Sequence, residues 1–326
     1  MQTGKAVTSG VVLRVTDTKE TDRILTVLTP DRGKIPLIAR GARRKNSRLA
    51  AACQMPAYSE LTIYKRGGWY LLDEASPIEL FDGLGRDIEL LALAAWFCEL
   101  TEAVCAEETA CPEILSLLLN GLYALCYTEK EPQLVKAAFQ FRLMALAGFE
   151  PLAEGCAVCG ARDVRAPMLD IFGGFVTCGG CKSPDSRMRL PLTEGGLAAL
   201  RHVLGADGKR LYSFTLEKSA LQTLDHAGEA FIAAQQGQAS GELFSAIEGN
   251  YADAVRLLTT AHSAKFDGKA TLFVAEKTRQ EGMDPQVVWG PWVGELEVFS
   301  QNCAHVDIIS PQAFEAIGPV VREILG

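Results

Sequence analysis

Two cysteine pairs with a fixed spacing constrain this 326-residue chain more than any other feature of its sequence. Cys156 and Cys159 form one C-x-x-C pair, Cys178 and Cys181 form a second, and 18 residues separate the two pairs. A C-x-x-C turn presents two thiolates from one short loop, so two such turns supply the four soft ligands of a tetrahedral zinc ion. The spacing predicts a zinc module over residues 156–181. Because four protein ligands leave no position for water, we expect a structural Zn²⁺.

The other readings of these cysteines are four thiols without metal or a redox dithiol. Neither pair opens a helix after a strand, as thioredoxin-type chemistry requires. The ten cysteines are spread through a large chain, which favours thiols or metal ligands over disulfides, and we expect no structural disulfide. For Cys98, Cys105, Cys111 and Cys126 we expect core packing.

The first 80 residues have the short apolar period of β-strands. The predicted strands cover residues 11–15, 23–29, 34–39, 61–64 and 69–72, with turns at 30–33 and 65–68. Five short strands in about 65 residues predict a small closed barrel, of which the OB-fold is the common nucleic-acid-binding case.

Charge is divided unevenly along the chain. The net charge is -8, but residues 1–80 carry 13 Lys and Arg against 8 Asp and Glu, so this part is basic. No acid occurs between Asp31 and Glu60, a window that is rich in cations. Such asymmetry points to an anionic ligand of the N-terminal domain.

After residue 81 the sequence becomes helical. Long apolar stretches with helical spacing run to about Gly148, Pro112 and Pro132 are placed to begin helices, and Gly148 is placed to end one. We expect an α+β multidomain protein with an OB-fold barrel over 1–80 and a helical domain with the zinc module over 81–235. The remaining residues, 236–326, form a third region.

Runs of residues in the first two domains resemble the RecO family of recombination mediators. The barrel runs are 18–26, 33–35 and 39–49, and the segment Ala147-Gly148-Phe149-Glu150-Pro151 before Cys156 resembles that family's junction between helices and zinc module. The resemblance covers about residues 8–228. It implies binding of single- and double-stranded DNA, annealing of complementary strands, and loading of RecA, together with RecR, onto strands coated by single-strand-binding protein.

With the basic window, this resemblance predicts a set of DNA-binding cations. They are Lys19, Arg23, Lys34, Arg40, Arg43, Arg44, Lys45, Arg48, Lys65 and Arg66. The barrel aromatics Tyr58, Tyr64, Trp69 and Tyr70 offer faces on which bases could stack, although core packing is the simpler explanation for each.

The C-terminal region resembles the end of the thioesterase domain in peptide synthetases of the enterobactin synthase type. In that α/β-hydrolase family a histidine matching His305 is the general base, but the chain contains no G-x-S-x-G nucleophile elbow. We therefore expect 236–326 to be a fused thioesterase-like fragment and the chain not to be an enzyme. His202, His226 and His262 are isolated, and we expect them to be structural or exposed.

Two alternatives stay open at this point. One is an acyl thioesterase, favoured by the C-terminal region alone. The other is a zinc-ribbon and OB protein that binds RNA, because phosphate contacts do not distinguish the two nucleic acids. No apolar run reaches the roughly 18 residues of a membrane span, and no signal-peptide pattern opens the sequence. We expect a bacterial cytoplasmic protein associated with the nucleoid and not with a membrane.

Overall fold

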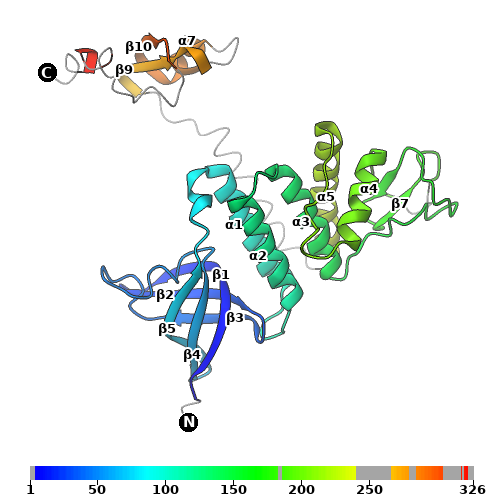
Figure 1. Cartoon of the computed structure of the whole chain (residues 1–326), viewed down its shortest axis with the longest axis horizontal. Helices are drawn as coiled ribbons and strands as arrows, with labels where there is room; N and C mark the ends of the chain where they lie inside the picture. The colour runs from blue at the N-terminus through cyan, green and yellow to red at the C-terminus, as the bar shows by residue number, and fades with distance from the viewer. Residues whose placement is uncertain are drawn as a thin grey trace. The chain divides into compact units, whose positions relative to one another are not determined.

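A computed structural model describes residues 4–182, 186–239, 266–278, 284–303, 317 and 319–321. The chain divides into two compact units, Met1–Tyr251 and Ala252–Gly326, which we call the N-terminal and C-terminal units (Figure 1). The finer predicted division, at 80/81 and at 235/236, stays a prediction.

The predicted five-stranded barrel is confirmed. Its strands are β1 (Ala6–Thr18), β2 (Asp22–Thr29), β3 (Gly33–Ala39), β4 (Tyr58–Arg66) and β5 (Trp69–Glu79), closed in the order β1-β2-β3-β5-β4. All pairs are antiparallel except β3 with β5, where Leu37 lies opposite Tyr70. Gly33 begins β3 with a φ of 63°, a conformation that costs glycine little.

Alternation of side chains divides the strand residues between two cores. Val12, Leu25, Val27, Ile35 and Leu37 fill the barrel interior. Val11, Leu13 and Leu28 point the other way and belong to the core of the helices. The barrel and the helical part therefore bury apolar surface against each other. Burial of apolar surface is the main favourable contribution to the packing of such elements.

Three helices follow the barrel, as the apolar spacing predicts. They are α1 (Ile88–Val104), α2 (Pro112–Tyr127) and α3 (Pro132–Leu146), preceded by the short η1 (Asp82–Arg86). Asp87 caps α1 by accepting the N–H of Glu89, and the two prolines lie at the first helical positions. Gly148 follows α3 with a φ of 92°.

The four-cysteine module follows the three helices. It contains β6 (Met168–Asp170), β7 (Phe175–Thr177) and β8 (Arg189–Pro191) in the order β7-β6-β8, and β6 and β7 form a hairpin between the two cysteine pairs. The helices α4 (Glu194–Gly205) and α5 (Lys218–Ala239) complete the unit. α5 packs against α3, and the rings of Phe141 and Phe231 stack with centroids 6.1 Å apart.

The C-terminal unit contains a pair of parallel strands, β9 (Phe266–Ala275) and β10 (Val293–Gln301). Between them lie η2 (Glu276–Thr278), α7 (Pro285–Trp289) and η3 (Gly290–Trp292). The resemblance to the thioesterase domain implies a last helix over 311–325, most of which lies outside the described residues. Among the described residues, no helix has the length and apolarity needed to cross a membrane.

Candidate metal centre and anion-binding surface

The four cysteines of the C-x-x-C pairs converge on one point. The Sγ atoms of Cys156, Cys159, Cys178 and Cys181 all lie within 4.8 Å of one another, and those of Cys159 and Cys178 are 4.0 Å apart. Four sulfurs at about 2.3 Å from a tetrahedral zinc ion stand about 3.8 Å from each other. The cluster therefore fits a zinc-sized ion with little movement.

Local backbone geometry prepares the cluster for metal. The N–H groups of Gly160 and Cys181 close the two turns by donating to the carbonyls of Cys156 and Cys178, at 2.8 and 3.0 Å. Burial disfavours the Cys156 thiolate, but the backbone N–H groups of Cys159, Cys178 and Val158 favour it and lower the pKa of this thiol to about 6. A thiolate is the form that binds metal.

The cluster is tied to the helical core. Cys156 is 3% exposed and belongs to the same apolar core as α1–α3. The amide of Gln235 on α5 donates to the carbonyls of Ile171 and Phe172 in the β6–β7 hairpin, at 3.0 and 3.2 Å. The hairpin between the two cysteine turns is therefore also held by α5.

A second site is formed where the β1–β2 turn meets the long β3–β4 connection. We call residues 40–57 the basic loop. Asp22 accepts the N–H of Gly41 at 2.8 Å, and the N–H of Arg43 donates to the carbonyl of Thr21 at 3.0 Å. Because Thr21 lies in the β1–β2 turn and Asp22 begins β2, the start of the basic loop is fixed against the barrel.

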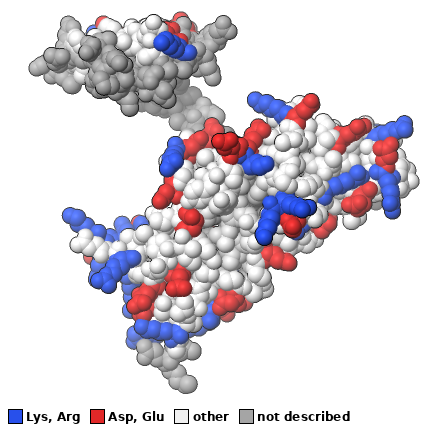
Figure 2. All heavy atoms as spheres, viewed as in Figure 1, with Lys and Arg blue, Asp and Glu red and all other residues white. Residues whose placement is uncertain are grey.

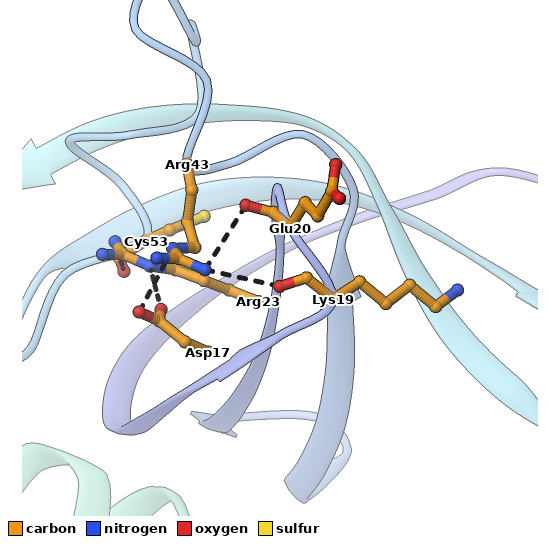
Figure 3. Close-up of polar contacts among 6 residues, drawn as sticks. All are labelled: Asp17, Lys19, Glu20, Arg23, Arg43 and Cys53. Carbon is orange, nitrogen blue, oxygen red and sulfur yellow. Dashed lines mark hydrogen bonds and ion pairs between the residues drawn. The ribbon is translucent and has the colours of Figure 1, made fainter.

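Two arginines, the half-buried Arg23 and the exposed Arg43, hold this junction together (Figure 3). Arg23 and Arg43 each form an ion pair with Asp17, both at 3.1 Å. Arg23 also donates to the carbonyl of Cys53, and Arg43 to those of Lys19 and Glu20. These two predicted DNA-binding residues are therefore part of the framework that shapes the loop.

The remaining cations of the basic loop face solvent. Arg40, Arg44, Lys45 and Arg48 are exposed, as is Lys19 on the turn. In the part of the chain that the structure describes, their side chains form no ion pair with an acid. Figure 2 shows basic side chains protruding from the barrel end of the N-terminal unit. An exposed cluster of one sign on a braced loop is suited to bind phosphates.

Three predicted cations lie elsewhere. Lys34 is at the start of β3, six residues from Arg40, a separation of about 20 Å along a strand. Its Nζ donates to the carbonyl of Glu102 at 2.6 Å, and Lys65 forms a 3.0 Å ion pair with Glu108. Arg66 is exposed at the β4–β5 hairpin. The ten predicted residues thus form two groups, and Lys34 and Lys65 contact the α1–α2 loop.

The barrel aromatics are placed differently from one another. Tyr58, Tyr64 and Tyr70 are half-buried; Tyr58 donates to Ser9, and the Lys65 ammonium lies over the ring of Tyr70. Trp69 is 52% exposed at the tip of the β4–β5 hairpin. Only Trp69 among these four presents a largely open ring.

The two described histidines take no part in either site. His202 lies 2.9 Å from the carbonyl of Arg210, and His226 is exposed. His262 and His305 lie outside the described residues.

The barrel, the helices and the four-cysteine module together define a class of DNA recombination and repair protein. The family model "Recombination protein O N terminal" matches residues 1–81, and "Recombination protein O C terminal" matches residues 85–241. The chain is 30% identical to the DNA repair protein RecO of Acetivibrio thermocellus over 69% of this chain and 89% of that protein. It is 38% identical to the RecO of Desulforudis audaxviator over 68% of this chain and 84% of that protein. The chain belongs to the RecO family.

A different similarity covers the C-terminal part. The "Thioesterase domain" family model matches residues 204–323, which confirms the predicted α/β-hydrolase-like region. Over 110 residues the chain is 64% identical to enterobactin synthase component F of Escherichia coli strain K12 and of Shigella flexneri. The match covers 34% of this chain but less than a tenth of the length of those relatives, 8% and 9%.

This similarity corrects one prediction. We predicted that the chain is not an enzyme and that its C-terminal region is a fragment without catalysis. The thioesterase match contradicts this, because it assigns residues 204–323 to an enzyme domain family. The prediction weighed the missing G-x-S-x-G pattern, the missing triad partners of His305 and the missing central sheet, whereas similarity over residues 204–323 points to possible enzymatic activity.

Proposed function

We propose that the N-terminal unit binds single- and double-stranded DNA through the basic loop and anneals complementary strands. The observation that carries this proposal is the braced basic loop, whose outward cations have no acidic partners among the described residues. Lysine and arginine that neutralise phosphates release counterions, which supplies affinity without base readout. Annealing needs such sequence-independent binding, because any two complementary strands have to be held together.

The same proposal extends to partners. Family membership supports RecR, single-strand-binding protein and RecA as functional partners, with loading of RecA onto coated strands as the outcome. Each of these steps requires assembly on DNA and no covalent active site. We place the protein with the chromosome in the cytoplasm, because that is where its ligand is.

The cysteine cluster is proposed to hold one structural Zn²⁺. Its closed set of four sulfurs and the fit of their spacing support zinc over an ion that prefers oxygen ligands. In this role the ion joins the β6–β7 hairpin to the cysteine turns and adds nothing to catalysis.

A strand-annealing assay tests the DNA proposal. Two complementary oligonucleotides, one carrying a fluorophore and one a quencher, are mixed with the full chain at low salt. We expect faster quenching than without protein, and a large loss of this acceleration in Arg44→Ala/Lys45→Ala/Arg48→Ala. Competition with matched RNA separates the RNA-binding alternative: tighter binding of single-stranded RNA than of DNA would favour it.

Thioester hydrolysis is a second candidate function, favoured by the match of residues 204–323. It would require a nucleophile outside the G-x-S-x-G pattern, since the chain has none. The test is hydrolysis of a simple acyl thioester by the full chain. Hydrolysis above background that disappears in His305→Ala would assign the activity to this region.

A further inference from the structure

The loop between α1 and α2 brings two thiols face to face. Cys105 directly follows α1, Cys111 directly precedes α2, and their Sγ atoms are 3.2 Å apart. A disulfide bond is about 2.0 Å long, so the sulfurs need to approach by only about 1 Å to be joined. Neither residue belongs to the four-cysteine cluster.

The two thiols differ in their access to solvent. Cys105 is 4% exposed, whereas Cys111 is only partly buried. Burial, together with the contact to Cys111, raises the pKa of the Cys105 thiol, although the nearby Lys34 ammonium acts in the opposite direction. A soluble reagent therefore reaches Cys111 first, and Cys105 is placed to react second.

The α1–α2 loop, which carries this pair, packs against the barrel. The N–H of Glu108 donates to the carbonyl of Lys34 at 3.0 Å, and the Glu108 carboxylate pairs with Lys65. Thr109 lies so close to Gly33 that a Cβ on this glycine would stand 1.9 Å from the Thr109 carbonyl oxygen. A covalent bond across the loop would therefore stiffen the junction between the two parts.

We propose that Cys105 and Cys111 are a reversible dithiol site that forms a disulfide on reaction with a low-molecular-weight disulfide such as oxidised glutathione. The Cys111 thiolate attacks one sulfur of the reagent and releases one molecule of glutathione. Cys105 then loses its proton and attacks the Cys111 sulfur, releasing the second glutathione. The protein pair is oxidised by two electrons and the reagent is reduced by two. The inference does not depend on DNA binding.

The sequence of the loop allows a direct test. Full-length protein is incubated with oxidised glutathione, free thiols are alkylated, and the chain is digested without reductant by an endopeptidase that cleaves after glutamate. Cleavage after Glu107 and Glu108 separates peptides 103–107 and 109–113, each with one of the two cysteines. These peptides stay together only if Cys105 and Cys111 are joined. We expect the linked pair, and its release by reductant.

Two single variants test the order of the steps. In Cys105→Ser we expect Cys111 to retain a glutathione adduct, because the resolving thiol is missing. In Cys111→Ser we expect Cys105 to remain free and to be alkylated only after unfolding. A wild-type chain in which Cys111 carries glutathione and no linked pair forms would overturn the proposal. So would a linked pair that appears only after denaturation, or equal modification of Cys105 in Cys111→Ser.

Discussion

The carboxylate of Asp17 pairs with the guanidinium of Arg43 at 3.1 Å, and this contact ties the basic loop to the end of β1. The neighbouring residue, Arg44, is exposed and forms no ion pair with an acid in the described residues. Adjacent arginines in one basic run thus have different roles. One shapes the surface and the other is available to an anionic ligand.

Stability measurements should separate these two roles. We expect Arg43→Ala to lower the free energy of unfolding by up to about 1 kcal/mol, because it removes an ion pair and two hydrogen bonds at the protein surface. Arg44→Ala should change it by less than about 0.5 kcal/mol, as is usual for exposed positions. Urea unfolding of both variants is the measurement. Equal destabilisation by both changes would show that Arg43 does not brace the loop.

Trp69 is predicted to stack on an unpaired base. Base stacking on an aromatic ring contributes about 1–3 kcal/mol, so Trp69→Ala should weaken single-strand binding roughly tenfold. Duplex binding should be unchanged, because paired bases are already stacked. Trp289→Ala is a matched control, since Trp289 is 51% exposed but lies in the C-terminal unit. Equal losses of affinity for the single strand and for the duplex in Trp69→Ala would argue against stacking.

Metal removal should destabilise the N-terminal unit. We expect one zinc per chain in protein purified without chelator, and none in Cys178→Ser, because three sulfurs cannot close the site. Elemental analysis measures the zinc, and thermal unfolding should show a lower Tm for the variant. As a control, Cys303→Ser, outside the cluster, should keep its metal. The zinc assignment would be contradicted if the wild-type chain contained no zinc and Cys178→Ser had the same Tm as the wild type.

A buried charge network between α3 and α5 predicts a pH dependence. Lys136 is 7% exposed and pairs with Asp225, at 3.2 Å, and with Glu229. Lys136→Met leaves these acids without their cation and should lower the free energy of unfolding by about 3 kcal/mol at pH 7. Lys130→Met, at an exposed position, is the control.

The sign of the pH effect follows from Asp225. Burial raises the pKa of this carboxyl above its ordinary value of 3.8, although Lys136 opposes the shift. The folded chain therefore binds a proton more readily than the unfolded chain, and the penalty for the unpaired carboxylate falls as the pH drops through the raised pKa towards 3.8. The loss of stability in Lys136→Met should be smaller at pH 5 than at pH 7. A larger loss at pH 5 would contradict this account.

The sequence predicted the elements better than it predicted their contacts. Alternating apolar residues are sufficient to predict the barrel strands, and the cysteine spacing predicted the cluster, because both signals are local. By contrast, the separation of Lys34 from Arg40 depends on strand length and on where the α1–α2 loop docks. The pairing of Arg43 with Asp17 and the approach of Cys105 to Cys111 depend on tertiary packing. Composition alone does not contain this information.

The dependence of single-strand affinity on salt tests the central claim most directly. Fluorescence anisotropy of a labelled oligonucleotide is measured with the full chain over a range of salt concentrations. We expect Arg44→Ala/Lys45→Ala/Arg48→Ala to bind more weakly and to reduce the slope of log affinity against log salt by about 2, since about 0.7 counterions are released per phosphate contact. The control Lys130→Ala/Lys209→Ala/Lys218→Ala removes the same charge from exposed positions outside the barrel and should leave the slope unchanged. An unchanged slope in the loop variant, or an equal change in both variants, would show that the basic loop is not the DNA-binding surface.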